Sequence, residues 1–103
     1  MRIIARRTLR EFVESLSGKK DQPAAKASLD AWFNEVSKAT WRSMADVKRR
    51  YATASVVGAE RIVFNIKGND YRLVVRINYP YRVVYVRFVG THDQYNEIDV
   101  KEV

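Results

Sequence analysis

The chain has 103 residues, 47% of them hydrophobic, which is enough for one domain (residues 1–103) with a real core. Lys and Arg number 19 against 12 Asp and Glu, and the net charge of +7 favours a polyanionic partner. The absence of cysteine excludes disulfides and zinc–thiolate sites and makes metal-dependent chemistry unexpected. Because no apolar run approaches the ~18 residues of a membrane span, we expect a soluble, cytoplasmic protein without a membrane partner.

The first third of the chain has the spacing of helices. Residues 2–5 form a candidate short strand, and Thr8 with Glu11 three residues on predicts a capping box that begins a helix. Gly18 breaks this helix, and Pro23 suits the first turn of the next one. Apolar residues at helical spacing give each helix one buried stripe, formed by Leu9, Phe12, Val13 and Leu16 and then by Ala25, Leu29, Trp32, Phe33 and Val36.

A third, short helix is predicted after Trp41, which we expect to cover the core. Ser43 followed by Asp46 is a candidate cap. The spacing places Met44, Val47 and Tyr51 inward and leaves a basic triplet outside, which is a candidate contact for a nucleic-acid backbone. The triplet is Lys48, Arg49 and Arg50.

The pattern then changes to period two, which is typical of strands, over residues 61–66, 71–77 and 82–89. Gly68-Asn69 is a two-residue hairpin turn signal. If Lys67 faces Asp70 across it, the register of the first two strands follows. Phe64 then faces Leu73 and Ile62 faces Val75 in the core, while Asn65 faces Arg72, Val63 faces Val74 and Arg61 faces Arg76 on the outer face, the sheet face that points away from the core.

A loop of about four residues around Tyr79-Pro80 gives the register of the last strand. It would bury Val84, Val86 and Phe88 and would place Arg72 opposite Arg87. Like charges in that position repel each other, so such a face suits a bound anion. The outer face would then carry Arg72, Arg76, Tyr85 and Arg87, and the fold class is α+β, with N-terminal helices packed on a small antiparallel sheet.

The only histidine follows this last strand. Thr91 with Gln94 three residues on predicts a capping box, which places His92 in the first turn of a short helix. Tyr95 lies three residues further, on the same side of that helix. An imidazole there can act as a base, or as an acid once another group recharges it, although a lone histidine is often structural.

These segments together resemble the HigB toxins of type II toxin–antitoxin systems, within the RelE/ParE superfamily. The resemblance covers most of the chain. It rests on Trp41 with residues 46–48, on residues 61–66, on the hairpin at residues 68–73, and on residues 84–92 leading to Tyr95.

The resemblance implies a ribosome-dependent mRNA endoribonuclease that uses no metal or other cofactor. In that chemistry the 2′-hydroxyl attacks the adjacent phosphate and leaves a cyclic phosphate and a 5′-hydroxyl. The resemblance also implies a cognate helix-turn-helix (HigA-like) antitoxin as partner, with DNA contacted only through that antitoxin, and mRNA and rRNA on the ribosome as further partners.

For this function we expect Arg72 and Arg87 to clamp the scissile phosphate and His92 to transfer protons. Two alternatives remain: a toxin of the same fold that inhibits DNA gyrase, or a noncatalytic RNA- or ribosome-binding module. The supporting candidates are Tyr95 and Lys67 for catalysis, and Arg61, Asn65 and Arg76 with the basic triplet for RNA binding.

Overall fold

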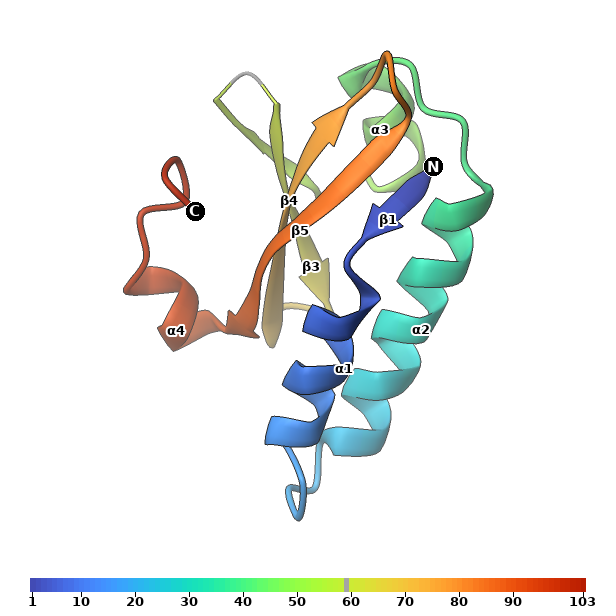
Figure 1. Ribbon diagram of the computed structural model, residues 1–103. Helices are drawn as coiled ribbons and strands as arrows, with labels where there is room; N and C mark the ends of the chain where they lie inside the picture. Colours follow the sequence, from blue (N-terminus) through green and yellow to red (C-terminus); the bar gives the residue numbers. More distant parts are fainter. Residues whose placement is uncertain (59) are drawn as a thin grey trace.

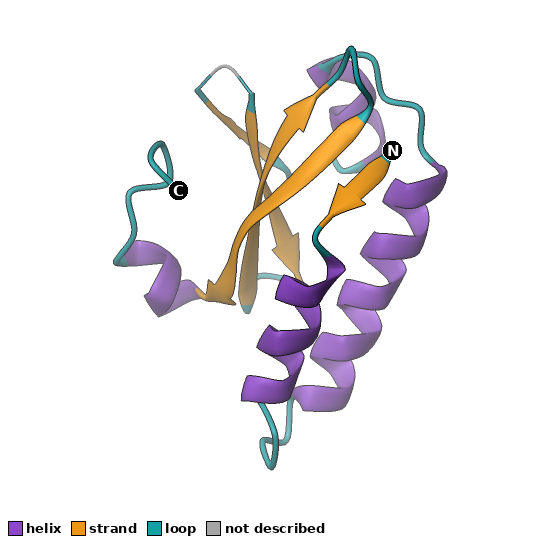
Figure 2. Cartoon of the chain, in the orientation of Figure 1, coloured by secondary structure: helices purple, strands orange, loops and turns teal. Residues whose placement is uncertain are grey.

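The computed structural model describes residues 1–58 and 60–103. A five-stranded sheet in the order β1-β5-β4-β3-β2 is covered on one face by α1 and α2, while α4 lies on the opposite side (Figures 1 and 2). This arrangement confirms the predicted α+β class. The elements are β1 (Arg2–Ile4), α1 (Arg6–Ser15), α2 (Gln22–Lys38), α3 (Met44–Arg50), β2 (Ser55–Val57), β3 (Arg61–Ile66), β4 (Tyr71–Asn78), β5 (Val83–Thr91) and α4 (His92–Asn96).

The N-cap of the first helix lies three residues earlier than the sequence predicts. Its N-cap is Ala5, so Thr8 lies inside α1 and the predicted capping box with Glu11 is wrong. Glu11 instead accepts a hydrogen bond from Arg7 at 2.6 Å, one turn earlier on the exposed side of the helix. In the described part of the chain, every helix is too short or too polar to cross a membrane.

The core is built around Phe64 of β3. Its ring centroid lies 5.5 Å from that of Trp32, 5.0 Å from Tyr51 and 6.3 Å from Trp41. Trp41 is only 6% exposed, which confirms that it covers the core rather than offering a face to a ligand. These aromatic contacts join the sheet to α2 and to the segments at both ends of α3, and they fix where α3 can lie.

The third helix forms where it is predicted, with two exceptions: Ser43 makes no side-chain capping bond, and Met44 does not point inward. Ser43 is its N-cap residue and Val47 is fully buried, but Met44 is 40% exposed, so its predicted inward position is wrong. The carboxylate of Asp46 accepts a hydrogen bond at 2.8 Å from the main-chain N–H of Arg42, just before the helix. The Ser43 side chain makes no capping hydrogen bond to α3. The Asp46 bond instead holds the chain where it turns into the helix.

The hairpin of β3 and β4 has the predicted register at every position. Phe64 pairs with Leu73 and Ile62 with Val75, and all four side chains are buried. On the outer face Asn65 pairs with Arg72, Val63 with Val74 and Arg61 with Arg76. The two-residue turn at Gly68-Asn69 is therefore sufficient to set the pairing.

A β-bulge in β5 changes its pairing with β4 from the one that the sequence predicts. The loop does have four residues, and Val84 and Val86 face the core opposite Ile77 and Val75. The register then shifts between Val74 and Val75, so Arg87 is the extra residue and has no partner on β4. Two predictions are wrong as a result: Arg72 pairs with Gly90 rather than Arg87, and Val89 takes the core position expected for Phe88.

The two edges of the sheet also differ from expectation. β1 pairs with β5 in parallel, so the sheet is mixed rather than wholly antiparallel. β2, which the sequence pattern did not predict, pairs antiparallel with β3 through three residues. A three-residue strand is too short for a period-two pattern to be distinguished from a loop.

Replacing Gly90 with alanine should loosen the junction of β5 and α4. A Cβ atom there would lie 2.6 Å from the Phe88 ring and 2.7 Å from Oε1 of Gln94, which accepts the capping bond from the Thr91 N–H. We expect a loss of about 1–3 kcal/mol in the free energy of unfolding, measured by denaturant titration. Gly18→Asn is the control, because that site is open and Asn tolerates positive φ; a Gly90→Ala protein as stable as the parent would contradict this packing.

Lys48 supports the fold, in contrast to its neighbours in the basic triplet. Its ammonium donates to the carbonyl oxygens of Ala52 at 2.8 Å and Ala54 at 2.5 Å, closing the loop after α3. Lys48→Ala should therefore lower the free energy of unfolding by about 1 kcal/mol. Arg49→Ala, which removes an exposed pair with Asp46 and a long hydrogen bond of 3.5 Å to the Ala45 oxygen, should change it by less than about 0.5 kcal/mol. Equal stability of the two variants in chemical denaturation would argue against the loop-closing role.

Candidate functional site

The outer face of the sheet is organised as three rows that run across β3, β4 and β5. The first row is Arg61, Arg76 and Tyr85; the second is Val63, Val74 and Phe88; the third is Asn65, Arg72 and Gly90. Val63 and Val74 are buried although they belong to this face. An apolar row thus separates two rows that carry arginine.

The first row opens into a small polar pocket at the end of the sheet near the β4–β5 loop. It has a volume of about 170 Å³ and is lined by Arg76, Asn78, Tyr85 and Arg87. Arg76 Nε donates to Glu60 at 2.7 Å, and Asn78 Oδ1 accepts from the Tyr81 N–H at 3.2 Å. Arg87 is exposed and has no hydrogen bond or ion pair with any residue that the structure describes.

This pocket is suited to an anion. A guanidinium offers a planar fork of N–H donors that fits a phosphate, and Arg87 has its whole fork available. The amide of Asn78, whose oxygen is already used, presents its N–H₂ group, and the phenol of Tyr85 is a further donor. The bulge is what turns Arg87 into this group.

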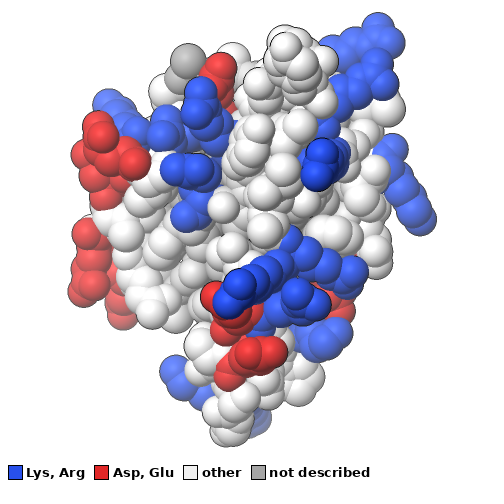
Figure 3. All heavy atoms as spheres, viewed as in Figure 1, with Lys and Arg blue, Asp and Glu red and all other residues white. Residues whose placement is uncertain are grey.

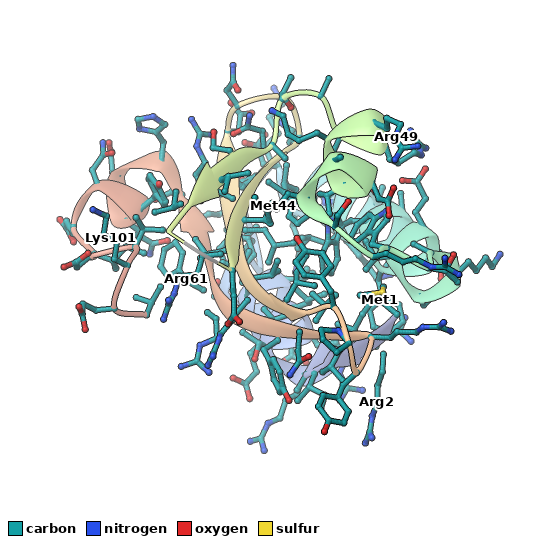
Figure 4. The ribbon with its side chains drawn as sticks, turned by 90° about the horizontal axis from the view of Figure 1, so that it is seen from above. Met1, Arg2, Met44, Arg49, Arg61 and Lys101 are labelled. Atoms are coloured by element: carbon teal, nitrogen blue, oxygen red, sulfur yellow. The ribbon has the colours of Figure 1, made fainter. Side chains whose placement is uncertain are left out.

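The other two arginines of the outer face are held by main-chain oxygens. Arg61 donates through Nε and Nη2 to the Val103 oxygen at 3.1 and 2.9 Å, and Figure 4 shows Arg61 on the same side of the molecule as Lys101. Arg72 is half-buried, and its Nη1 donates to the Asn69 oxygen at 2.7 Å. The bond to Asn69 leaves Nε and Nη2 of Arg72 as donors.

Arg72 and Arg87 occupy separate positions along β5. Arg72 pairs with Gly90, three residues from Arg87, which corresponds to about 10 Å along a strand. The predicted direct repulsion between Arg72 and Arg87 is therefore absent. The arginines that do face each other are Arg61 and Arg76; Arg61 is bound by Val103, and Arg76 is bound by Glu60. Arg72 and Arg87 therefore do not face each other across the ladder, contrary to the prediction from the sequence.

His92 is positioned by the capping box that the sequence predicts. The Thr91 hydroxyl accepts from the Gln94 N–H at 3.1 Å, and Gln94 accepts from the Thr91 N–H at 2.9 Å, so α4 starts at His92. The imidazole is exposed, with Nδ1 3.2 Å from the side-chain nitrogen of Asn96. If that amide donates to Nδ1, a neutral ring carries its proton on Nε2. Because Arg72 pairs one position before Thr91, His92 lies at the Arg72 end of the outer face.

Tyr95 and the acidic residues complete this end of the molecule. Tyr95 is half-buried on α4, which contacts β4 and β5. Residues 91–103 contain four acids and one lysine, and Figure 3 shows acidic side chains along the edge formed by α4 and the segment after it. The negative edge borders a positive face, which confines an anionic ligand to the sheet side.

Lys67 lies on a different surface, and Asn65, at the end of the third row, borders that surface as well. The Lys67 ammonium lies 2.8 Å from Asp70 and 3.5 Å from Asp21, just before α2, and the hydrogen bond that it donates to Asp70 raises the pKa of Lys67. Asn65 donates to the Thr53 oxygen at 3.2 Å. Both line a small cavity with Trp32 of α2. Lys67 is thus a fixed cation directed toward α2, and a poor proton acceptor.

The basic triplet is exposed as predicted, but its members differ. Lys48 binds main-chain oxygens, whereas Arg49 pairs with Asp46 and Arg50 pairs with Glu35 of α2. The residues that the sequence analysis missed are Asn78 in the pocket and two further cations beside α3, Lys38 and Arg42. Asn78 could have been found, because it lies two residues after Arg76 on the same strand face.

Comparison with known proteins agrees with this geometry. A sequence profile described as HigB toxin, the RelE-like toxic component of a toxin–antitoxin system, matches residues 25–98. No curated protein matches the chain. The matched segment includes α2 from Ala25 onward, α3, strands β2 to β5 and α4 with His92. The chain therefore belongs to the HigB family of RelE-like toxins and is the toxin of a toxin–antitoxin pair.

Proposed function

We propose that this toxin is a ribosome-dependent, metal-independent mRNA endoribonuclease of the cytoplasm. In this proposal residues 1–103 act as one domain, and a helix-turn-helix antitoxin holds the toxin inactive. The observation that carries the proposal is the outer face, where the free guanidinium of Arg87 and the partly free one of Arg72 flank a buried apolar row. Membership of a RelE-like toxin family and the net charge of +7 support an RNA substrate.

The chemistry requires two proton transfers and stabilisation of one additional negative charge. The 2′-hydroxyl loses its proton as its oxygen attacks the adjacent phosphorus, and the P–O5′ bond breaks as that oxygen gains a proton. The products are a 2′,3′-cyclic phosphate and a free 5′-hydroxyl. Arg72 is assigned to the charge that develops on the phosphorane, because its free N–H donors lie at the His92 end of the face.

His92 is assigned to proton transfer, with Tyr95 as the candidate second group. The imidazole is exposed at the start of α4, so it can reach a bound strand, and Asn96 orients it through Nδ1. Tyr95 lies one turn along the same helix. The Arg87 pocket is assigned to a neighbouring phosphate of the same RNA strand. Arg87 is then an RNA-binding residue and does not share the scissile phosphate with Arg72.

The experiment that tests this function maps the 5′ ends of transcripts in cells that express the toxin. Discrete new 5′-hydroxyl ends in translated mRNA support the endoribonuclease. If RNA binding persists without any new ends, the protein is a noncatalytic RNA-binding toxin. Inhibition of purified DNA gyrase with intact transcripts would instead identify the gyrase-inhibiting alternative.

His92→Gln should lower the cleavage rate about 10²-fold or more, because glutamine keeps a hydrogen-bonding group but cannot titrate. RNA affinity should remain that of the parent. Single-turnover cleavage of ribosome-bound mRNA measures the rate, and Glu97→Gln, an exposed position at the end of α4, is the control. Parent-like cleavage by His92→Gln would move proton transfer to Tyr95.

Arg87→Gln should affect affinity more than rate. The loss of one charge-assisted phosphate contact is worth about 1.5–3 kcal/mol, or roughly 10- to 100-fold in the dissociation constant for a noncleavable 2′-deoxy strand. The saturated cleavage rate should change by much less. Arg10→Gln removes an exposed cation from α1, on the other side of the sheet, and should change neither quantity. A large loss of the saturated rate in Arg87→Gln would show that this residue acts on the scissile phosphate.

A further inference from the structure

The outer face continues beyond β5 onto β1, which Figure 1 shows alongside it. Ile3 packs on the core, so its neighbours Arg2 and Ile4 point to the outer face. They pair with Val83 and Tyr85 of β5, respectively. The first row therefore extends from Tyr85 to Ile4, and a further row beyond it consists of Asn78, Val83 and Arg2.

Arg2 is a free cation of this extended face. Its side chain is exposed and makes no hydrogen bond or ion pair with any residue that the structure describes, and Figure 4 shows it at the edge of the molecule. The main chain is fixed, because the Arg2 N–H donates to the Arg82 oxygen at 2.8 Å. Its partner Val83 lies four residues before Arg87 on β5, or about 13 Å along a strand. Arg2 thus offers a second guanidinium beyond the Arg87 pocket.

The surface between Arg2 and that pocket is apolar. Ile4 is 37% exposed on the edge strand, beside Tyr85, which lines the pocket. Contact with a sugar or a base would remove part of this apolar surface from water. The two rows hold no acid, and Glu60, beside the first row, is paired with Arg76. This end of the face therefore suits a polyanion better than a protein surface of mixed charge.

Tyr81 extends into solvent from the loop between β4 and β5. It is 80% exposed, the highest fraction among the large hydrophobic side chains that the structure describes. The loop itself is ordered: Asn78 Oδ1 accepts from the Tyr81 N–H at 3.2 Å, and the Tyr79 oxygen accepts from the Arg82 N–H at 3.1 Å. Arg82 is in turn the residue to which Arg2 is bonded. An aromatic ring is thus held in place next to a free guanidinium.

We infer that this end of the outer face binds one further nucleotide of the mRNA, with Arg2 on its phosphate and the Tyr81 ring stacked on its base. The inference rests on the proposed function, and it extends the path of the strand from the Arg87 pocket across β5 to β1. A cation beside an exposed aromatic ring is the combination that binds single-stranded nucleic acid, because every nucleotide has a phosphate and every base has a π-face. Stacking reads no hydrogen-bonding edge, so the subsite adds affinity with little preference between bases.

The test measures binding of the purified full-length toxin to a noncleavable 2′-deoxy strand of about ten nucleotides over a salt series. Tyr81→Leu should weaken binding about 5- to 100-fold without changing the slope of log affinity against log salt. Arg2→Gln should weaken binding about 10-fold, and its slope should fall by about 0.7, the value for one lost phosphate contact to a single strand. The two variants thus separate the stacking contact from the charge contact.

A strand of the same length without bases isolates the stacking. The parent and Tyr81→Leu should bind this abasic strand equally, because neither has a base to stack on. Tyr81→Phe keeps the ring and should bind the intact strand like the parent. Arg10→Gln removes the same charge as Arg2→Gln from an exposed position on α1 and should keep both the affinity and the slope of the parent.

Three results would overturn the inference. They are parent-like binding of the intact strand by Tyr81→Leu, a parent-like salt slope in Arg2→Gln, and unchanged strand binding with weaker binding of the purified antitoxin, which would assign this surface to the antitoxin. The transcript 5′ ends made by the parent toxin decide the proposed function separately. A toxin that binds the strand through Arg2 and Tyr81 but cuts no transcript would keep this subsite and lose the nuclease activity.

Discussion

One extra residue in β5 determines how the outer face is arranged. Arg87 lies in the bulge between the pairs Val75–Val86 and Val74–Phe88, and a regular ladder would have placed it directly opposite a residue of β4. The bulge instead frees Arg87 from pairing and turns it toward Arg76, Asn78 and Tyr85. It also shifts the end of the strand by one residue, so that Gly90 meets Arg72 and the chain enters α4 with His92 on the outer side. Without the shift, Phe88 would face the core and the apolar row across the outer face would be lost.

The cations divide into those that hold the fold and those that are free for a ligand. Arg61, Arg76 and Lys67 are bound by Val103, Glu60 and two aspartates, and Lys48 closes the loop after α3. Exposed pairs of this kind contribute little to stability, but they fix the direction of each side chain. The net charge is therefore a poor guide to the binding surface. The cations available to a polyanion are those without an acceptor; among the described residues these include Arg87 on the outer face and Lys38 and Arg42 beside α3.

The sequence predicts those parts of the molecule whose geometry is fixed by neighbouring residues. The β3–β4 register follows from one turn, and the start of α4 follows from the reciprocal bonds of Thr91 and Gln94. The bulge could not be predicted, because a β-bulge changes the pairing without changing the period-two pattern on either side of it. Thr8 and Glu11 have the spacing of a capping box, but the helix already begins after β1, with its N-cap at Ala5, three residues before Thr8. Lys38 and Arg42 were missed because they flank α3 in space while belonging to no single periodic segment.

The buried apolar row separates the two arginine-bearing rows of the outer face. Val63 and Val74 are withdrawn from solvent, so no ligand can lie directly between the Arg72 row and the Arg76 row at that depth. In the proposed function Arg72 and Arg87 each bind their own phosphate, and a strand that reaches both is held at two points along its length. Two-point attachment fixes the direction of the strand relative to His92, because a strand placed in reverse would present its 2′-hydroxyls differently to the imidazole. Positioning of this kind suits an enzyme whose reaction depends chiefly on the alignment of a 2′-oxygen with the departing 5′-oxygen.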